Sequence, residues 1–432
     1  MNLIDARTVP VDPESGRRLR DAGFAYRIVD LTDDAAAGAF VRADARGFLD
    51  EDPDAASVQR MTEAWATRRN TGVYETDASA HDLPIATVNA WVTPMTVPGG
   101  EIPLWAISSV TVAATHRRRG IARNLLEGEL RAAASAGVPA AGLTASEATI
   151  YSRYGFAPAV PVARVAIDTR RAGWAAGASS GRLEYIERDI AVGELEAVHE
   201  RSRPLRSGQV PGWQGRWKRA AGLGEGPDKG RDVRSVRHVD AQGRTTGILT
   251  YTLKELPGEF RSILKIMQLV TETDEALRAL WGFAVNHDLV NRVEADLRPV
   301  DDPIPYLVAD QRAVEFAVHD HGWLRVLDVP AVLRARRYQH ASDVTLRVED
   351  PYGFATGTWR LTVGADGTAD VEPTHREPAV SMAAATFSAA YAGGVALSRL
   401  AAAGRVDGDA AAIASLTRTL LVDPAPQLGI WY

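Results

Sequence analysis

Apolar and polar positions in the first part of the chain follow two different periods. In Ile85–Thr93 every second residue is apolar, which predicts a strand with one buried face. Strands are also predicted for Phe24–Leu31, for Leu104–Val112 and for a short buried run at 140–146. Between the last two, apolar residues fall at the spacing of an amphipathic helix: Ala122, Leu125, Leu126, Leu130 and Ala133. This order predicts an α/β domain.

The rest of the chain shows two further patterns. Strands predicted at 245–256 and 261–270 precede a helix at 273–288, in an order that resembles the first unit. Strands at 342–350 and 357–363 then lead into alanine-rich helices, which is typical of an α+β domain. We therefore predict a flexible arm at 1–20, α/β domains at 21–168 and 169–335, and a third domain at 336–432.

Composition narrows the class of protein. The 432 residues carry a net charge of −6, which argues against a general nucleic-acid binder. Because the chain has no cysteine, disulfides, thiolate metal sites and a cysteine nucleophile are excluded. No metal-ligand pattern stands out. His319–His321 are expected in a surface loop, and Arg334–Arg337 on the solvated face of a helix.

One stretch is long enough to be considered as a membrane span. Ser381–Ser398 has no charged residue, but it consists largely of Ala, Gly and Ser rather than large apolar residues. We expect a buried helical segment, broken near Gly393–Gly394, and no membrane span. No secretory signal is visible, because charged residues such as Asp5 and Arg7 interrupt any early apolar run, so a cytoplasmic protein is expected.

A basic turn precedes the helix of the first unit. Arg117, Arg118 and Arg119 run into Gly120, between the strand that ends at Val112 and the helix. Free amides at a helix start, together with the helix dipole, favour an anion, and glycine lets the backbone approach it closely. A solvated basic loop is the alternative. The sequence contains neither a Gly-Lys-Ser/Thr phosphate loop nor a Rossmann turn.

Longer segments around this turn resemble the motifs of a known protein family. Arg117-x-x-Gly120-x-Ala122 is similar to the pyrophosphate turn of GNAT acetyltransferases, which bind acetyl-CoA. The strings VTVAATHRRRG and SEATIYSRYGFAPA resemble the enhanced-intracellular-survival (Eis) family of N-acetyltransferases over nearly the whole chain. The resemblance implies two GNAT-like domains, the second without a cofactor, and a C-terminal sterol-carrier-protein-like domain. It also implies a homohexamer, a dimer of trimers.

The resemblance assigns roles to residues of the first domain and of the C-terminus. Backbone groups would bind the pantetheine arm and the turn would wrap the pyrophosphate, with two residues beside the reactive end of the cofactor. Tyr151 would be the general acid and the C-terminal carboxylate of Tyr432 the general base. The predicted cofactor residues are Val110, Thr111, Val112, Arg117, Arg118, Arg119, Gly120, Ile121, Ala122, Arg123, Ser146 and Glu147.

These roles suit direct transfer of an acetyl group from a thioester to an amine. The amine must lose a proton to a base, and a phenol can protonate the departing thiolate. Without a cysteine, an acetyl-cysteine intermediate is impossible. Both residues have structural alternatives, since Tyr151 could simply pack in a core and Tyr432 could be a frayed end.

The acceptor implied by the resemblance is a polycationic amine, such as an aminoglycoside or a lysine side chain. Phe48, Asp50 and Trp65 resemble pocket-lining positions, with a solvated acidic loop at 47–54 as the alternative. The best-studied members carry an acidic penultimate residue, whereas this chain has Trp431, which puts the aminoglycoside range in doubt. The competing function is a lipid-binding or scaffolding protein with a vestigial acetyltransferase fold. Acetyl-CoA is the only cofactor expected, without a metal.

Overall fold

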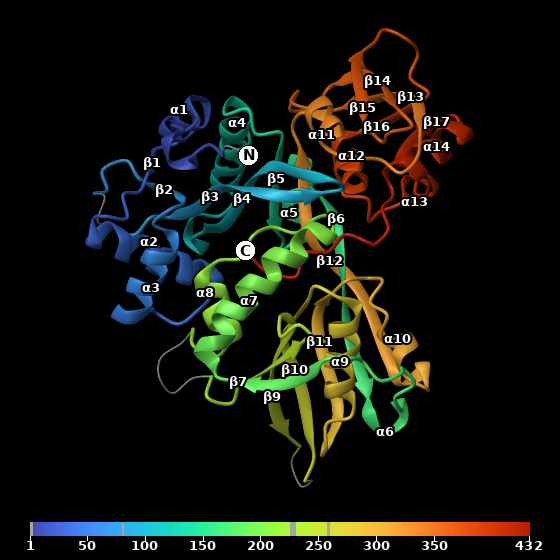
Figure 1. The fold of residues 1–432 in the computed structure, drawn as a ribbon. Coiled ribbons are helices and arrows are strands. Elements are labelled where there is room, and N and C mark those ends of the chain that lie inside the picture. Colours follow the sequence, from blue (N-terminus) through green and yellow to red (C-terminus); the bar gives the residue numbers. More distant parts are fainter. Residues whose placement is uncertain (1–2, 80–81, 225–229, 257–259) are drawn as a thin grey trace.

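A mixed sheet of twelve strands runs through the first two predicted domains of the computed structural model (Figure 1). The structure describes residues 3–79, 82–224, 230–256 and 260–432. Within these residues the strands of the sheet are ordered β1-β2-β3-β4-β5-β12-β6-β11-β10-β9-β8-β7. A separate five-stranded sheet forms the third domain, which lies apart at the upper right in Figure 1.

The N-terminal domain surrounds one half of the large sheet. Its helix α4 packs on the face formed by the alternating apolar residues of β3, as the sequence pattern predicts. Helix α2 covers the opposite face, and Asp33 caps it by accepting hydrogen bonds from the amides of Ala35 and Ala36. The elements are α1 (Pro13–Asp21), β1 (Phe24–Ile28), α2 (Asp34–Phe48), α3 (Ala55–Trp65), β2 (Arg69–Glu75), β3 (Ala86–Val97), β4 (Gly100–Val112), α4 (Ile121–Ser135), β5 (Ala140–Thr144), α5 (Ala148–Tyr151) and β6 (Ala157–Asp168).

The predicted flexible arm at 1–20 is wrong for the part that the structure describes. Helix α1 lies against α4, where the Ser15 hydroxyl donates to the main-chain oxygen of Asn124 and Leu19 is fully buried. The buried guanidinium of Arg69 donates to the carbonyl oxygens of Val9 and Pro10. A polar composition concealed this docking, because the charged side chains of the arm find distant partners on α4: Arg131 donates to Asp12, and Arg18 donates to Glu127.

The second domain repeats the element order of the first, as predicted. Its helix α9 begins at the predicted position, with Thr273 as the cap. The order is α6 (Thr169–Ala172), β7 (Arg182–Ile186), α7 (Arg188–Ser202), α8 (Gln214–Ala220), β8 (Arg234–Val239), β9 (Thr245–Glu255), β10 (Ser262–Thr271), α9 (Asp274–Val285), β11 (Val290–Arg298), α10 (Ile304–Leu307) and β12 (Val314–Val326).

A long ribbon formed by β6 and β12 joins the two halves of the sheet. Strand β6 pairs with β11 of the second domain, and β12 returns to pair with β5 of the first. The expectation of a surface loop at His319–His321 is wrong, because these residues lie in β12. Pro161 stands where the register between the two strands shifts, so its missing N–H costs no ladder bond.

The third domain packs helices against its small sheet. The uncharged stretch Ser381–Ser398 enters this domain as a strand end and a buried helix that stops before Gly393, as expected. In the described residues no helix is long and apolar enough to cross a membrane. The elements are α11 (Val329–Ala335), β13 (Ser342–Glu349), β14 (Gly357–Val363), β15 (Ala369–Pro373), β16 (Val380–Ala383), α12 (Ala384–Tyr391), α13 (Leu397–Ala402), β17 (Val406–Gly408) and α14 (Ala410–Leu420).

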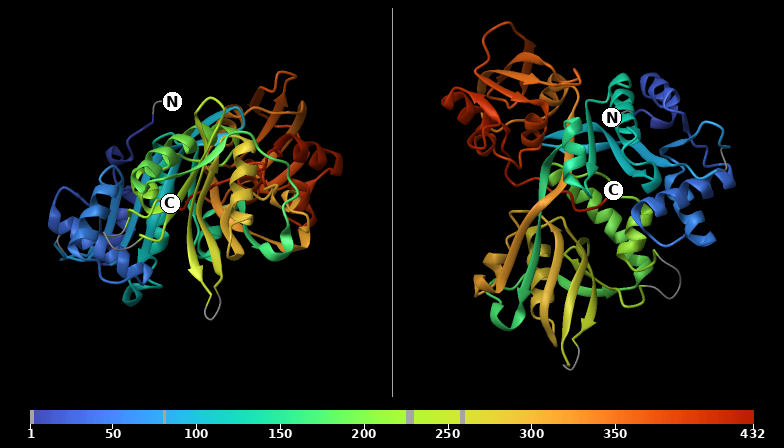
Figure 2. Two further views of the ribbon diagram at one scale, coloured as in Figure 1. Left: turned by 60° about the horizontal axis from the view of Figure 1, so that its bottom comes forward. Right: turned by 180° about the vertical axis from the view of Figure 1, so that it is seen from behind.

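The C-terminal segment leaves the third domain and returns to the centre of the molecule. In the view from behind, it crosses the middle of the molecule toward the first domain (Figure 2). The amide of Gln427 donates to the carbonyl oxygen of Ser207, and Leu428 and Ile430 are buried. The segment is therefore an ordered part of the core rather than a frayed end.

A buried ion pair fastens the third domain to the ribbon. Arg325 of β12 donates from one nitrogen to both carboxylate oxygens of Asp350, each at 2.7 Å, and both side chains are excluded from solvent. Arg325 also donates to the main-chain oxygen of Tyr154. Although burial raises the pKa of Asp350, the hydrogen bond and charge of Arg325 outweigh it, and the pKa lies below its usual value.

We predict that Asp350→Ala lowers the free energy of unfolding by about 3–5 kcal/mol, because it leaves the Arg325 guanidinium buried without a counterion. Urea unfolding followed by circular dichroism measures the change. Asp343→Ala is the control, since Asp343 pairs with Arg360 on the surface and its loss should cost less than about 1 kcal/mol. Equal losses for the two variants would contradict the prediction.

Candidate functional site

Strands β4 and β5 diverge after a short parallel pairing. Only Leu104, Trp105 and Ala106 of β4 are in register with β5 within the described residues, whereas β4 stays paired with β3 up to Val112. Ser109 interrupts β4 with a φ of 55°, and the β3–β4 register shifts nearby. The edge of β4 that includes Val110, Thr111 and Val112 therefore presents main-chain groups toward the gap between the strands.

The basic turn lies next to this gap and opens helix α4. Gly120 is the N-cap with a φ of 78°, a conformation that a side chain would strain, and no side chain caps the helix. Arg118 also has a positive φ, and the first turn contains no acidic residue. The first-turn amides of Ile121, Ala122 and Arg123 belong to the group that an α-helix leaves without intrahelical partners. These features of the turn favour an anion.

The arginines of the turn differ in their contacts. Arg119 stacks over the ring of Phe24, and Arg123 forms an ion pair with Glu127 one turn along the helix. Arg117 and Arg118 are exposed and form no ion pair with the described residues. These two guanidinium groups remain available to an anion.

The corresponding helix of the second domain has a different N-terminus. Thr273 caps α9 by accepting a hydrogen bond from the amide of Ala276, and the first turn carries Asp274 and Glu275. Negative side chains occupy the position where a phosphate would bind and would repel it. The two α/β domains therefore share a topology but not an anion site.

Tyr151 lies one short turn beyond β5, beside two other predicted residues. Burial raises the pKa of Tyr151, the charge of Glu147 adds to this shift, and a hydrogen bond with Ser146 opposes it. The ring packs edge-on against Phe156, with centroids 6.3 Å apart. A phenol with a raised pKa stays protonated at neutral pH, which a proton donor requires.

Tyr432 lies at the end of β5. The Thr144 hydroxyl donates to the main-chain oxygen of Tyr432 at 2.7 Å, and the Tyr432 ring contacts Trp91 edge-on at 5.6 Å. The preceding Trp431 packs its ring against buried His321, whose Nε2 lies 2.9 Å from the carbonyl oxygen of Ile430. The structure thus brings the end of the sequence to the mouth of the β4–β5 gap.

The three predicted pocket residues differ in exposure. Phe48 and Asp50 are exposed at and after the end of α2. Trp65, in contrast, is buried in a core, where its ring packs edge-on against Phe40 at 5.8 Å. In this structure the Trp65 ring serves the packing of α2 against α3, and a pocket-lining role for it stays a prediction.

A buried polar cluster on the α2 face was not predicted. Asp44 contacts Ser109 at the interruption of β4, and the Asn89 amide donates to the Ser109 hydroxyl at 3.0 Å. Arg68 donates to Asn89 and stacks over Trp91 at 3.8 Å. The only signal in the sequence was the acidic residue on the otherwise apolar face of α2.

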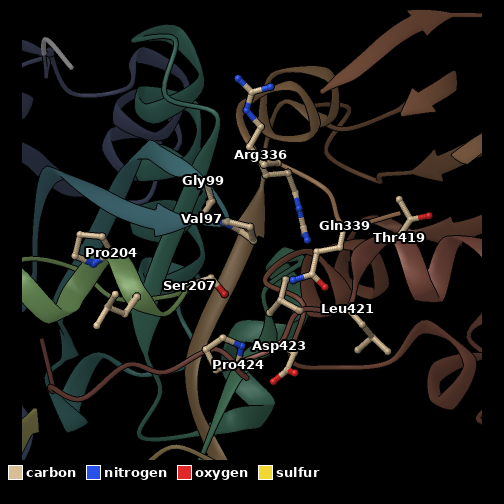
Figure 3. Close-up of a pocket in the computed structure, with 14 residues that line it drawn as sticks. Val97, Gly99, Pro204, Ser207, Arg336, Gln339, Thr419, Leu421, Asp423 and Pro424 are labelled. Carbon is tan, nitrogen blue, oxygen red and sulfur yellow. The ribbon is translucent and has the colours of Figure 1, made fainter. Parts of the chain in front are cut away.

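A separate pocket lies where the three domains meet (Figure 3). It measures about 170 Å³ and is lined by residues of the β3–β4 turn, the segment after α7, and the start and end of the third domain. Arg336 borders it but is itself buried, because it donates to the carbonyl oxygens of Tyr391 and Leu420. The expectation of a solvated face at Arg334–Arg337 is wrong for this residue. None of the predicted site residues lines this pocket.

Comparisons with known proteins agree with this architecture. Residues 29–159 and 209–326 each match an acetyltransferase (GNAT) domain, and residues 329–429 match a sterol carrier protein domain. These matches confirm the predicted fold class. A crystal structure of Eis1 from Mycobacterium abscessus superimposes with a TM-score of 0.78 at 28% identity, over 95% of this chain and 100% of that chain.

Full-length relatives are also similar. An N-acetyltransferase of Streptomyces avermitilis, described as uncharacterized, is 32% identical over 85% of this chain and 96% of its own length. The N-acetyltransferase Eis of Mycobacterium tuberculosis is 32% identical over 72% of this chain and 76% of its own length. The chain is a GNAT acetyltransferase that belongs to the Eis family, as its motifs indicated.

His321 gives the docked C-terminal segment a pH dependence. Burial lowers the pKa of His321 to about 4, and its Nδ1 has no partner. A protonated His321 is therefore disfavoured in the folded protein but not in the unfolded chain, where its pKa is about 6.5. The stability that depends on neutral His321 is complete above pH 6.5 and is lost as the pH falls toward 4.

We predict that the difference in unfolding free energy between the wild type and His321→Gln shrinks by about 3 kcal/mol from pH 7 to pH 4. Gln retains a donor for the carbonyl oxygen of Ile430 but does not titrate. Chemical unfolding of both proteins at several pH values measures the difference, in which the shared carboxylates cancel. A difference that is independent of pH would refute this role for His321.

Proposed function

We propose that this chain transfers the acetyl group of acetyl-CoA directly to an amine of a cationic acceptor. The observation that carries the proposal is the position of Tyr432, whose main-chain oxygen accepts a hydrogen bond from Thr144 where β4 and β5 diverge. This is the place at which a thioester held between the two strands would meet an acceptor.

The cofactor would lie along the open edge of β4. Its pantetheine amides would pair with main-chain groups of Val110–Val112, as an added strand does. Its pyrophosphate would bind the uncapped start of α4 and the exposed guanidinium groups of Arg117 and Arg118. The uncapped helix and the absence of acids from its first turn fit this anion.

Two groups would then move the protons. Tyr151, held protonated by its surroundings, would donate to the sulfur of the leaving thiolate. The α-carboxylate of Tyr432, the last residue of the sequence, would take a proton from the amine nitrogen as the new amide forms. A hydrogen bond from Thr144 would orient this carboxylate.

The acceptor would be a polycationic small molecule or a lysine side chain. The exposed acidic residues after α2 support attraction of a cation to the mouth of the site, with Asp50 as a direct contact and Phe48 beside it. Because Trp431 stands where an acidic residue would be expected, we propose a weaker preference for aminoglycosides than for simpler polyamines. A homohexamer remains part of the proposal.

Acetyl-CoA turnover with a panel of polyamines, aminoglycosides and lysine peptides tests the function. We expect thiol release that depends on both substrates, and a rise in the melting temperature when CoA is added. Absence of turnover with every amine, together with absence of a thermal shift, would instead favour a lipid-binding or scaffolding protein.

We predict that Tyr151→Phe lowers kcat about 10²-fold and leaves the affinity for CoA unchanged, because the variant removes only the proton donor. Tyr154→Phe is the matched control. The Tyr154 ring is also buried, but it contacts the ring of Tyr352 in the third domain. Steady-state kinetics and calorimetric titration with CoA separate the two effects. Equal loss in both variants would assign Tyr151 to packing alone.

Removal of Tyr432 tests the proposed base independently. We predict a loss of kcat with retained CoA affinity, because Tyr432 contacts β5 and Trp91 rather than the basic turn. Extension of the chain by one glycine is the sharper variant, since it keeps the tyrosine ring and displaces only the carboxylate. An extended chain with full activity would exclude the α-carboxylate as the base.

A further inference from the structure

Transfer to a protonated amine requires two proton acceptors in sequence. The acceptor ammonium must lose one proton before its nitrogen can attack the thioester, and the nitrogen loses a second proton when the tetrahedral adduct collapses. One proton ends on the released thiol and the other in solvent. The α-carboxylate of Tyr432 would serve only one of these steps at a time.

Asp44 is a buried acidic group next to β4 at Ser109. It lies on the sheet-facing side of α2 with 6% of its surface exposed, and its Oδ1 has no hydrogen-bond partner. Its carboxylate contacts the side chain of Ser109, the residue that interrupts β4 with a positive φ. A buried oxygen without a partner costs stability, so a functional reason for it is expected.

Asp44 forms no salt bridge with the residues that the structure describes. Asn89 donates to the Ser109 hydroxyl from β3, and Arg68 is turned toward Asn89 and Trp91. The charges that act on Asp44 come from Asp50, beyond the end of α2, and from Arg68, before β2. The path from Asp44 through Ser109, Asn89, Arg68 and Trp91 ends at Tyr432.

We propose that Asp44 accepts the first proton of the acceptor ammonium through the hydroxyl of Ser109. One N–H bond of the ammonium breaks as an O–H bond forms at Ser109, whose own proton passes to the Asp44 carboxylate. The neutral amine then attacks the thioester. Asp44 returns its proton to solvent after product release, so that no other reactant is needed. This role rests on the proposed acetyl transfer.

The electrostatic surroundings suit this task. Burial raises the pKa of Asp44 to about 7, the charge of Asp50 adds to the shift, and the Ser109 hydrogen bond and Arg68 oppose it. A base is most effective when its pKa lies near the working pH. A free α-carboxylate ordinarily has a pKa of about 3.5, so it retains a proton far less well.

The experiment compares acceptor amines of different basicity in the wild type and in Asp44→Asn. For an alkylamine that is protonated at neutral pH, we expect kcat/KM at pH 7 to fall about 10²-fold in the variant. For an amine that is largely neutral at pH 7, such as 2,2,2-trifluoroethylamine, the loss should be far smaller, because no proton has to be removed before attack. The limb of the wild-type pH profile near pH 7 should also disappear.

Ser109→Gly tests the path of the proton. Glycine accepts the positive φ of this position and removes the hydroxymethyl side chain. If Ser109 carries the proton to Asp44, the single variants and the double variant should show similar losses, because both act in one step. Asp34→Asn, in the exposed first turn of α2, is the matched control and should leave kcat/KM unchanged.

The outcomes separate this proposal from the acetyl transfer on which it rests. A wild type without turnover of any amine contradicts the proposed function itself. An active wild type with Asp44→Asn losses that are equal for basic and weakly basic amines overturns the proton-acceptor role and leaves Asp44 as a structural residue. Melting temperature and CoA affinity, expected to be unchanged, verify that the variant is folded.

Discussion

The antiparallel pairing of β6 with β12 is the constraint on which the rest of the molecule depends. Each strand belongs by sequence to one α/β domain and completes the sheet of the other, so neither domain has a free edge at the junction. The same ribbon carries Arg325, which binds the third domain, and His321, which binds the C-terminal segment. One pairing therefore positions the third domain and the end of the chain relative to β5.

The divergence of β4 from β5 opens a gap next to the end of the chain. A fully paired sheet would bury the main-chain groups of β4 and leave no place for a ligand between the strands. Here the pairing of β4 with β5 ends at Ala106, Ser109 interrupts β4 with a positive φ, and helix α4 begins beyond the gap without a side-chain cap. The second domain has the same order of elements, but its α9 is capped by Thr273 and carries Asp274 and Glu275 in the first turn, so the charge at the helix start, rather than the topology, distinguishes the two domains.

Sequence patterns predicted the elements whose signals lie within one short segment of the chain. Alternation along β3, the period of α4 and the arginine–glycine turn each lie within one short segment and needed no partner to be recognised. Strand β6 was not predicted, and only its pairing with β12 shows that Pro161 falls at a register shift. Buried His321 and Arg336 resembled surface residues because their partners are main-chain oxygens distant in sequence.

The absence of a direct ion pair between Asp44 and Arg68 matters to the chemistry. An arginine in contact with Asp44 would hold its pKa low, as Arg325 does for Asp350, and would leave a poor proton acceptor. Arg68 is instead stacked on Trp91 and hydrogen-bonded to Asn89, and burial lowers its own pKa to about 10. The charge of Arg68 lowers the pKa of Asp44 without direct contact and so partly opposes the effect of burial. The carboxylate can therefore both gain and release a proton near neutral pH.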